Sequence, residues 1–274
     1  MPRSNALLTL CALLWPALAS AQFETFSRQT PDGTQVALDL GISLLDNEDD
    51  VRLLRVDLYS QIEAGAGAVY VVIPWSVIAP EDDDHDGAVG NIEIGGFYDF
   101  TRGSFGLTAV FGLILPTAAE DGPGFFANVG AMLPRFTDPI TALPEALGFR
   151  FGASPRFDSR WILLRGDLGI DVGFPVGSTA EAIDTQLYVR LNAGLGLRAG
   201  PMVLTAEFVN TANISESGPE AAEDQFIHSA GVTLSYLSRW ADAHLGMVFP
   251  LDEAMSGEVM AVTMGLTLYP DSFF

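Results

Sequence analysis

The sequence contains no lysine and only one cysteine, Cys11, and no uncharged apolar run beyond residue 22 reaches the length of a membrane-spanning helix. Because all 13 basic residues are arginines, every basic side chain is a planar, permanently charged guanidinium. A single cysteine excludes an intramolecular disulfide, so noncovalent packing must hold any folded domain together. A spanning helix needs roughly 18 or more apolar residues. The chain is nevertheless 49% hydrophobic, with a mean hydropathy of +0.29.

Charge of one sign dominates the chain. The 13 basic residues face 35 acidic ones, and the formal net charge is −22. A molecule of this charge repels phosphate backbones, which argues against nucleic acid as a partner.

The N-terminus has the three parts of a secretory signal. Arg3 precedes the apolar run 6–18, and the small residues 19–21 form a cleavage site. We therefore expect a signal peptide at 1–21, export across the inner membrane, and one mature domain at 22–274. Cys11 lies inside this signal. A lipoprotein anchor at Cys11 is a weaker alternative, because Leu10 precedes it where a small residue is expected.

Alternation of apolar and polar residues recurs along the mature chain at the two-residue period of a β-strand. In the stretch 90–117, two alternating runs flank a tight turn. Each is about as long as the 9–11 residues that a tilted strand needs to cross a bilayer. The predicted strands are 34–45, 51–63, 67–78, 89–100, 103–116, 147–157, 160–174, 184–198, 201–211, 226–237, 240–250 and 257–269.

Short and long connections alternate between these twelve runs, and most of the acidic clusters lie on the long ones. Bacterial outer-membrane barrels combine short periplasmic turns, long external loops and an even number of strands. The sequence therefore predicts an all-β fold, an antiparallel transmembrane β-barrel of about 12 strands in the bacterial outer membrane, with periplasmic termini and long acidic external loops. An exported soluble β-sandwich, usually with shorter strands, is the alternative.

An outer-membrane barrel implies three kinds of partner: outer-membrane lipid and lipopolysaccharide, the barrel-assembly machinery, and a small-molecule permeant. The terminal Phe274 resembles the signal that barrel-assembly machinery recognises, although Pro270 interrupts the usual alternating strand.

The segment 117–146 is the longest connection, and we interpret it as one long external loop folded into the mouth of the barrel. The apolar run 125–133 within it could instead form a thirteenth strand. That alternative would make the strand number odd and would exchange the sides of the later short turns and long loops.

Three stretches resemble a family of outer-membrane proteins described as transporters, including the phenol-degradation MetA-pathway type. They are 70–76 (YVVIPWS), 90–100 (GNIEIGGFYDF) and 112–117 (GLILPT). The resemblance covers about the second quarter of the chain. It implies a β-barrel connected with the uptake of small, often apolar molecules, and it supplies no ligand residues.

One motif points to a cofactor. The segment 82–93 reads DDDHDGAVGNIE and matches the calcium-loop pattern D-x-D-x-D-G-x5-E. Carboxylates at positions 1, 3, 5 and 12 can surround a hard cation, and the glycine allows the sharp turn. The predicted ligands of a Ca²⁺ ion are therefore Asp82, Asp84, Asp86 and Glu93. The flanking strands exclude an ordinary EF-hand, and a solvated acidic loop is the alternative.

A second constellation lies on the inward parity of the predicted strands. Three neighbouring strands present an arginine-rich wall to the lumen, and other strands present carboxylates. These charges either neutralise each other in a plug or form a field that selects what passes. The predicted lumen-lining residues are Arg150, Arg156, Arg165, Arg190, Arg198, Asp57, Glu207 and Asp242.

These observations favour a narrow outer-membrane channel or transporter for small apolar or anionic molecules. A closed barrel that serves structure or surface interaction, without transport, is the main alternative. An outer-membrane hydrolase is a weaker one, because the adjacent His228 and Ser229 on one strand point to opposite faces and cannot act as partners. We therefore predict no catalytic residues and no enzyme activity.

Overall fold

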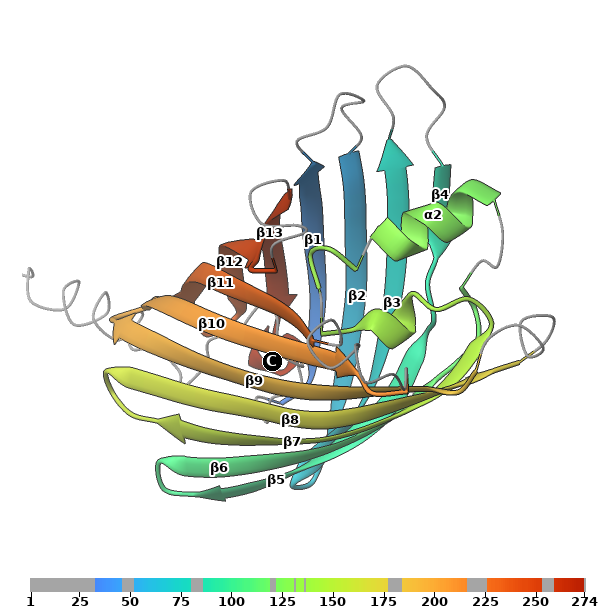
Figure 1. Ribbon diagram of the computed structural model, residues 1–274. Helices are drawn as coiled ribbons and strands as arrows, with labels where there is room; N and C mark the ends of the chain where they lie inside the picture. The colour runs from blue at the N-terminus through green and yellow to red at the C-terminus, as the bar shows by residue number, and fades with distance from the viewer. Residues whose placement is uncertain are drawn as a thin grey trace, which may run out of the picture.

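The computed structural model describes residues 33–45, 52–79, 86–118, 122–130, 132–135, 137–176, 184–215, 226–252 and 259–273. Almost all of these residues belong to one closed antiparallel sheet (Figure 1). None of the helices in the described ranges has the length and hydropathy of a membrane span. The predicted signal peptide at 1–21 lies outside the described residues.

The strands follow the chain in order around the barrel. They are β1 (Gln35–Leu45), β2 (Arg52–Ala64), β3 (Gly67–Ala79), β4 (Asp86–Val89), β5 (Glu93–Arg102), β6 (Phe105–Ile114), β7 (Ala146–Asp158), β8 (Ile162–Pro175), β9 (Gln186–Ala199), β10 (Met202–Asn213), β11 (Phe226–Leu237), β12 (Ala241–Pro250) and β13 (Val259–Leu268).

Three pairings close the ring. β1 pairs with the last strand, β13, and with β2, while β2 also pairs with β3. β4 and β5 both pair with β3, one after the other, so they are two parts of a single interrupted strand. The barrel therefore has twelve strands, as predicted. Closure gives every described strand except β4 a strand partner on both sides, which removes most of the free edge of the sheet.

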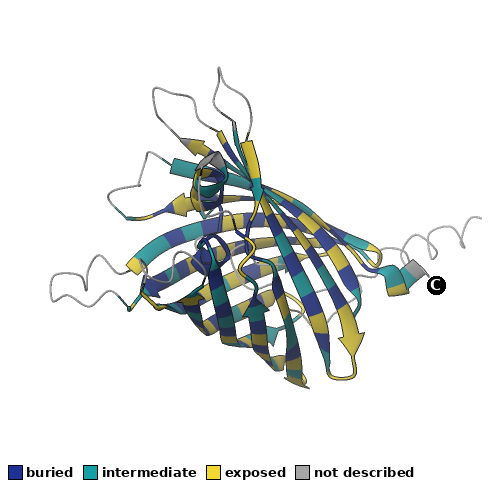
Figure 2. Ribbon diagram, turned by 90° about the vertical axis from the view of Figure 1, so that its right-hand side faces the viewer, coloured by how far each residue is buried: buried dark blue, intermediate teal, exposed yellow. Residues whose placement is uncertain are grey.

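The two faces of the sheet differ in exposure, as Figure 2 shows by the alternating bands of buried and exposed residues along the strands. In β12 every second residue is buried, and the residues between them are exposed. The outward positions are large and apolar, for example Phe111, Leu195 and Leu245, which are 48%, 44% and 55% exposed. The buried inward positions are largely polar or charged. An apolar outside and a polar inside suit a barrel whose outer surface contacts lipid.

The short turns predicted from the sequence lie at one end of the barrel. Three of them contain a glycine with positive φ, at Gly65 (66°), Gly103 (64°) and Gly200 (63°), a conformation that costs glycine little. The long acidic connections are largely outside the described residues.

The run 125–133 is not a strand. Most of it belongs to helix α2 (Gly122–Gly130), which packs against β3 and β4, and the chain continues into the short 3-10 helix η1 (Pro139–Thr141). β6 and β7 on either side of the connection pair directly with each other, so a strand between them would have no partner. The thirteenth-strand alternative is therefore wrong.

Gly265 illustrates how closely the inward side chains pack. It lies on β13 between Asp39 of β1 and His244 of β12. A Cβ at this position would stand 1.9 Å from the Asp39 carboxylate and 2.4 Å from the His244 ring. The glycine therefore allows these two side chains to meet across β13.

We expect Gly265→Ala to destabilise the barrel by about 1–3 kcal/mol, because the added methyl group displaces Asp39 or His244. The folded barrel should run faster unheated than boiled on a detergent gel, and the variant should lose the fast form at a lower temperature. Gly152→Ala is the matched control, since a Cβ there meets its nearest atom at an ordinary 3.4 Å. Equal transition temperatures in the two variants would contradict this packing.

Candidate functional site

Part of the connection between β6 and β7 lies inside the barrel, where it forms what we call the inserted segment, the described residues of 132–145 (Figure 1). Leu133 packs against Val248 of β12 and Ala261 of β13. Pro134 covers Gly41 of β1, where a Cβ would meet the proline ring at 2.6 Å. At the other end of the segment, Ile140 lies over two inward glycines, Gly148 and Gly173. The segment therefore crosses the lumen from β1, β12 and β13 to β7 and β8.

Asn91 joins the two ends of the connection between β6 and β7. It lies in the break between β4 and β5 and is fully buried. Its amide nitrogen donates to the carbonyls of Ile140 (3.0 Å) and Leu143 (2.6 Å), and its amide oxygen accepts from the backbone N–H groups of Thr117 (2.9 Å) and Ala118 (2.8 Å). These four bonds use the full capacity of the side chain. Asn91 thus links the start of the connection between β6 and β7, at Thr117 and Ala118, to the inserted segment at Ile140 and Leu143.

A network of buried ion pairs continues from the inserted segment into the wall. Arg135 binds Asp57 of β2 (2.8 Å) and Asp138 of its own segment (3.4 Å). Asp57 also accepts from its neighbour Arg55 (3.0 Å), whose guanidinium donates to Thr141 as well. The segment is therefore fixed to β2 by charge as well as by packing.

On the opposite side of the segment, Arg150 of β7 is shared by three carboxylates. It contacts Asp138 (2.7 Å), Glu93 of β5 (2.7 Å) and Asp171 of β8 (3.1 Å). Asp171 in turn binds Arg190 of β9 (3.1 Å). The ion pairs thus form one continuous chain across the lumen, from β2 through the inserted segment to β9.

The network is nearly neutral. Its four arginines are Arg55, Arg135, Arg150 and Arg190, and its five carboxylates are Asp57, Glu93, Asp138, Asp167 and Asp171. A buried charge without a partner costs several kcal/mol, so each member depends on the others. The predicted arginine-rich wall is therefore not a bare positive surface, because carboxylates of the same and neighbouring strands accompany it.

Asp138 joins the two halves of the network and lies outside the strands. Burial alone would raise the pKa of its carboxyl. The guanidinium groups of Arg150, Arg135 and Arg55 outweigh burial and hold the pKa of Asp138 below its ordinary value.

The remaining predicted lumen residues also occupy inward positions. Arg156 binds Asp99 of β5 (2.8 Å), and Arg198 binds Asp158 at the short-turn end (3.1 Å). Arg165 is half-buried on β8. Glu207 and Asp242 are buried on β10 and β12, and Asp242 accepts a hydrogen bond from Tyr269 (2.6 Å).

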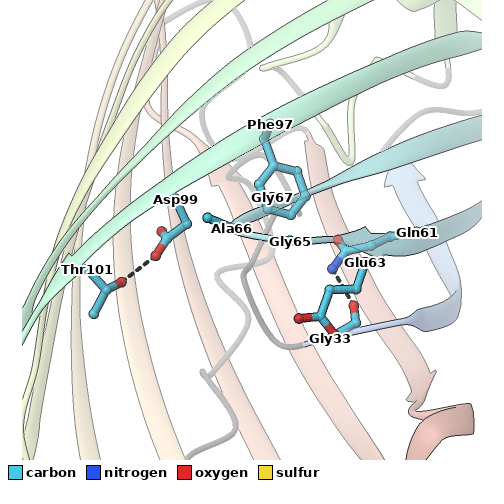
Figure 3. A pocket seen from close by; sticks show the side chains of 9 residues that line it. All are labelled: Gly33, Gln61, Glu63, Gly65, Ala66, Gly67, Phe97, Asp99 and Thr101. Atoms are coloured by element: carbon cyan, nitrogen blue, oxygen red, sulfur yellow. Dashed lines mark hydrogen bonds between the residues drawn. The ribbon is translucent and has the colours of Figure 1, made fainter.

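A cavity of about 240 Å³ lies at the short-turn end of the barrel (Figure 3). The ring of Phe97 and the carboxylates of Glu63 and Asp99 contribute to its lining. Gln61 at its edge donates to the Gly33 carbonyl (2.6 Å). This end of the barrel therefore offers an acidic recess to small molecules, whereas the inserted segment occupies the lumen nearer the long connections.

The four predicted calcium ligands are not all described. Asp82 and Asp84 lie outside the described residues, and Asp86 begins β4 in an exposed position. Glu93 is buried inside the barrel, where it binds Arg150 and accepts from the Tyr70 hydroxyl. No group of three or more His, Cys, Asp or Glu that could hold a metal ion occurs among the described residues. The calcium site stays a prediction, and a cation there would compete with Arg150 for Glu93.

The histidine–serine pair singled out in the sequence, His228 and Ser229, is divided between the two faces of β11. His228 faces outward between the rings of Phe208 and Phe226 and bonds Asn210. Ser229 is fully buried and so lies on the inward face. His244 contacts Asp39 inside the barrel (3.3 Å) and stands opposite the buried Ser235 of β11.

Comparison with known proteins identifies the fold of the chain but assigns the chain to no family. Neither a protein-family model nor a curated protein matches the sequence. Among solved structures, an outer membrane channel from Pseudomonas putida F1 is similar with a TM-score of 0.59 at 11% identity, over 91% of this chain and 99% of that chain. The NanC porin is similar with a TM-score of 0.55 at 4% identity, over 85% and 99% of the two chains. The chain thus has the fold of outer-membrane β-barrels.

Sequence reasoning missed several residues of this site. Arg135 and Asp138 belong to a connection without periodicity, so no pattern placed them in the lumen. Asn91 and Tyr70 lie in stretches singled out for their resemblance to a family, but nothing indicated their partners. Arg55 shares the inward parity of Asp57, so the alternation along this strand could have placed it in the lumen.

We expect Asn91→Leu to release the inserted segment, because it removes the four hydrogen bonds of the Asn91 amide, and each buried group left without a partner costs about 1–3 kcal/mol. Thermolysin cleavage between residues 132 and 145 of the barrel in detergent should speed up about tenfold or more. Asn213→Leu is the control, since its amide donates to Gln186 near the rim (2.8 Å). Unchanged cleavage in the Asn91 variant would show that this side chain does not hold the segment.

Docking of the segment should depend on pH through Asp138. Because folding lowers the pKa of Asp138, its ionised form stabilises the docked segment at every pH above the unfolded value of about 3.9, and this stabilisation is lost as the pH falls further. Pepsin should therefore cleave within 132–145 slowly at about pH 4 and faster at about pH 2. In Asp138→Asn the cleavage should be fast at both values. A wild-type rate independent of pH would count against this role.

Proposed function

We propose that the protein is a narrow outer-membrane channel or transporter for small molecules. The observation that carries this proposal is the inserted segment with its ion-pair network, which restricts the lumen of a closed barrel without removing its polar lining. The apolar outer surface supports a location in the outer membrane, in contact with lipid and lipopolysaccharide. The names of the two similar structures, a porin and an outer membrane channel, support the same function.

The dimensions of the barrel fit a restrictive pathway. Eight strands enclose little more than side chains, and sixteen leave an aqueous channel, so twelve lie between these limits. A solute that passes the inserted segment must pass beside guanidinium and carboxylate groups on neighbouring strands. Such an arrangement sorts solutes by size and by charge.

A closed barrel without transport is the second candidate. The observation that favours it is the nearly complete pairing of the buried charges, which lets the interior act as a packed polar core. Conductance separates the two candidates, because a closed barrel passes no ions whatever the charges of its interior.

We expect discrete conductance steps when the purified protein is inserted into a planar bilayer. Arg190→Gln and Arg165→Ala should shift the reversal potential towards cations, because each removes a positive charge from the lumen. The change in the anion-to-cation permeability ratio should be about fivefold, equivalent to roughly 1 kcal/mol of local electrostatic free energy.

Arg160→Ala is the matched control, since the Arg160 guanidinium lies on the ring of the exposed Trp161 at the short-turn end. It should leave the ion selectivity unchanged. Absence of conductance, together with no uptake of small solutes into liposomes, would support the closed barrel instead.

A further inference from the structure

Away from the arginines of the ion-pair network, the inner face of the barrel on β1 and β10–β13 is lined with small hydroxyl side chains. Six of them are at most 2% exposed, and their hydroxyl groups have no hydrogen-bond partner within the described part of the chain. We call this surface the hydroxyl wall, and it consists of Ser43, Thr211, Ser229, Thr233, Ser235 and Thr263.

The centre of the hydroxyl wall is a pair of threonines on either side of a glycine. Thr233 of β11 and Thr263 of β13 both stand opposite Gly246 of β12. A Cβ at Gly246 would lie 2.7 Å from both hydroxyl oxygens. The two hydroxyls therefore converge over a position where any other residue would displace them.

This pair is enclosed on two sides. Towards the long connections, Leu133 of the inserted segment packs on Val248 and Ala261, and Pro134 covers Gly41, which is the neighbour of Thr263 on β1. Towards the short turns, Asp39 and His244 meet across Gly265, one inward row below the threonines. The threonine pair thus lies between the inserted segment and a polar pair that spans β13.

Buried hydroxyls without partners cost free energy, and valine would fill the same volume without that cost. A hydroxyl both donates and accepts but carries no net charge, so two of them suit a neutral hydrogen-bonding group better than an ion. The buried arginines, which would hold an anion, all belong to the network around Arg150, whereas the ionisable groups beside the hydroxyl wall are Asp39, Glu207, Asp242 and His244. The two halves of the lumen therefore offer different chemistry.

We propose that Thr233 and Thr263 form a binding site for small uncharged solutes that carry hydroxyl or carbonyl groups. The site lies on the short-turn side of the inserted segment. A solute that has passed the segment loses hydrating water and forms hydrogen bonds with these two hydroxyls instead. This inference rests on the proposed function and names the class of solute that the same lumen accepts.

The test is uptake of radiolabelled xylitol, a neutral polyol, into liposomes that contain the full-length protein. Uptake by the wild type should saturate with xylitol concentration. Thr233→Val and Thr263→Val keep the side-chain volume and should each raise the half-saturating concentration about fivefold, the equivalent of one net hydrogen bond. Ion conductance of the same variants should remain at the wild-type level.

Thr233→Ser and Thr263→Ser are the matched controls, because serine keeps the hydroxyl and should retain saturable uptake. Gly246→Ala provides a second route to the same site, since its methyl group would occupy the space between the hydroxyls and should also weaken xylitol uptake. The fast-migrating form on a detergent gel verifies that each variant is folded.

The outcomes separate this inference from the proposed function. A wild-type protein that passes neither ions nor xylitol would overturn both. Conductance with xylitol uptake that does not saturate, or that the valine substitutions leave unchanged, would overturn only the solute site and would mean that the hydroxyls bind water alone.

Discussion

The interior of this barrel depends on the requirement that a buried charge have a partner. Arg150 satisfies it with three carboxylates, one from the inserted segment, one from the adjacent strand β8 and one from β5, two strands away. Neither the wall nor the segment could keep its charged residues buried alone, because removing one partner leaves the other uncompensated. Folding of the barrel and docking of the segment therefore stabilise each other.

The same requirement explains why the lumen is divided. The bulky charged side chains occupy the side formed by β2, β5 and β7–β9, where the segment supplies the carboxylate and the guanidinium that complete the network. The side formed by β1 and β11–β13 carries glycine, serine and threonine at many inward positions, together with the Asp39–His244 pair. The described residues of the segment that pack there, Leu133 and Pro134, are apolar. The inserted segment thus contacts a charged side and a side of small residues. It presents charged groups to the first and apolar groups to the second.

The strands could be predicted from the sequence because alternation at a period of two is imposed by the geometry of the sheet. The same parity placed Arg150, Arg190 and Asp57 on the inner face. It could not reveal helix α2 or the docking of Arg135 and Asp138, since a connection has no period and its path depends on partners distant in sequence. Glu93 shows the limit most clearly, because the local pattern suggested a cation ligand while the fold brings a guanidinium to it.

The pairing of β1 with β13 has a consequence for biogenesis. The first strand of the barrel finds its second neighbour only when the last strand has been made and translocated, so the ring cannot close during synthesis. Contacts between the two ends of a chain also form slowly, since a long loop must be ordered first. Until that moment both edges of the sheet are unpaired templates. The barrel of a chain of this design therefore stays open until its final residues arrive.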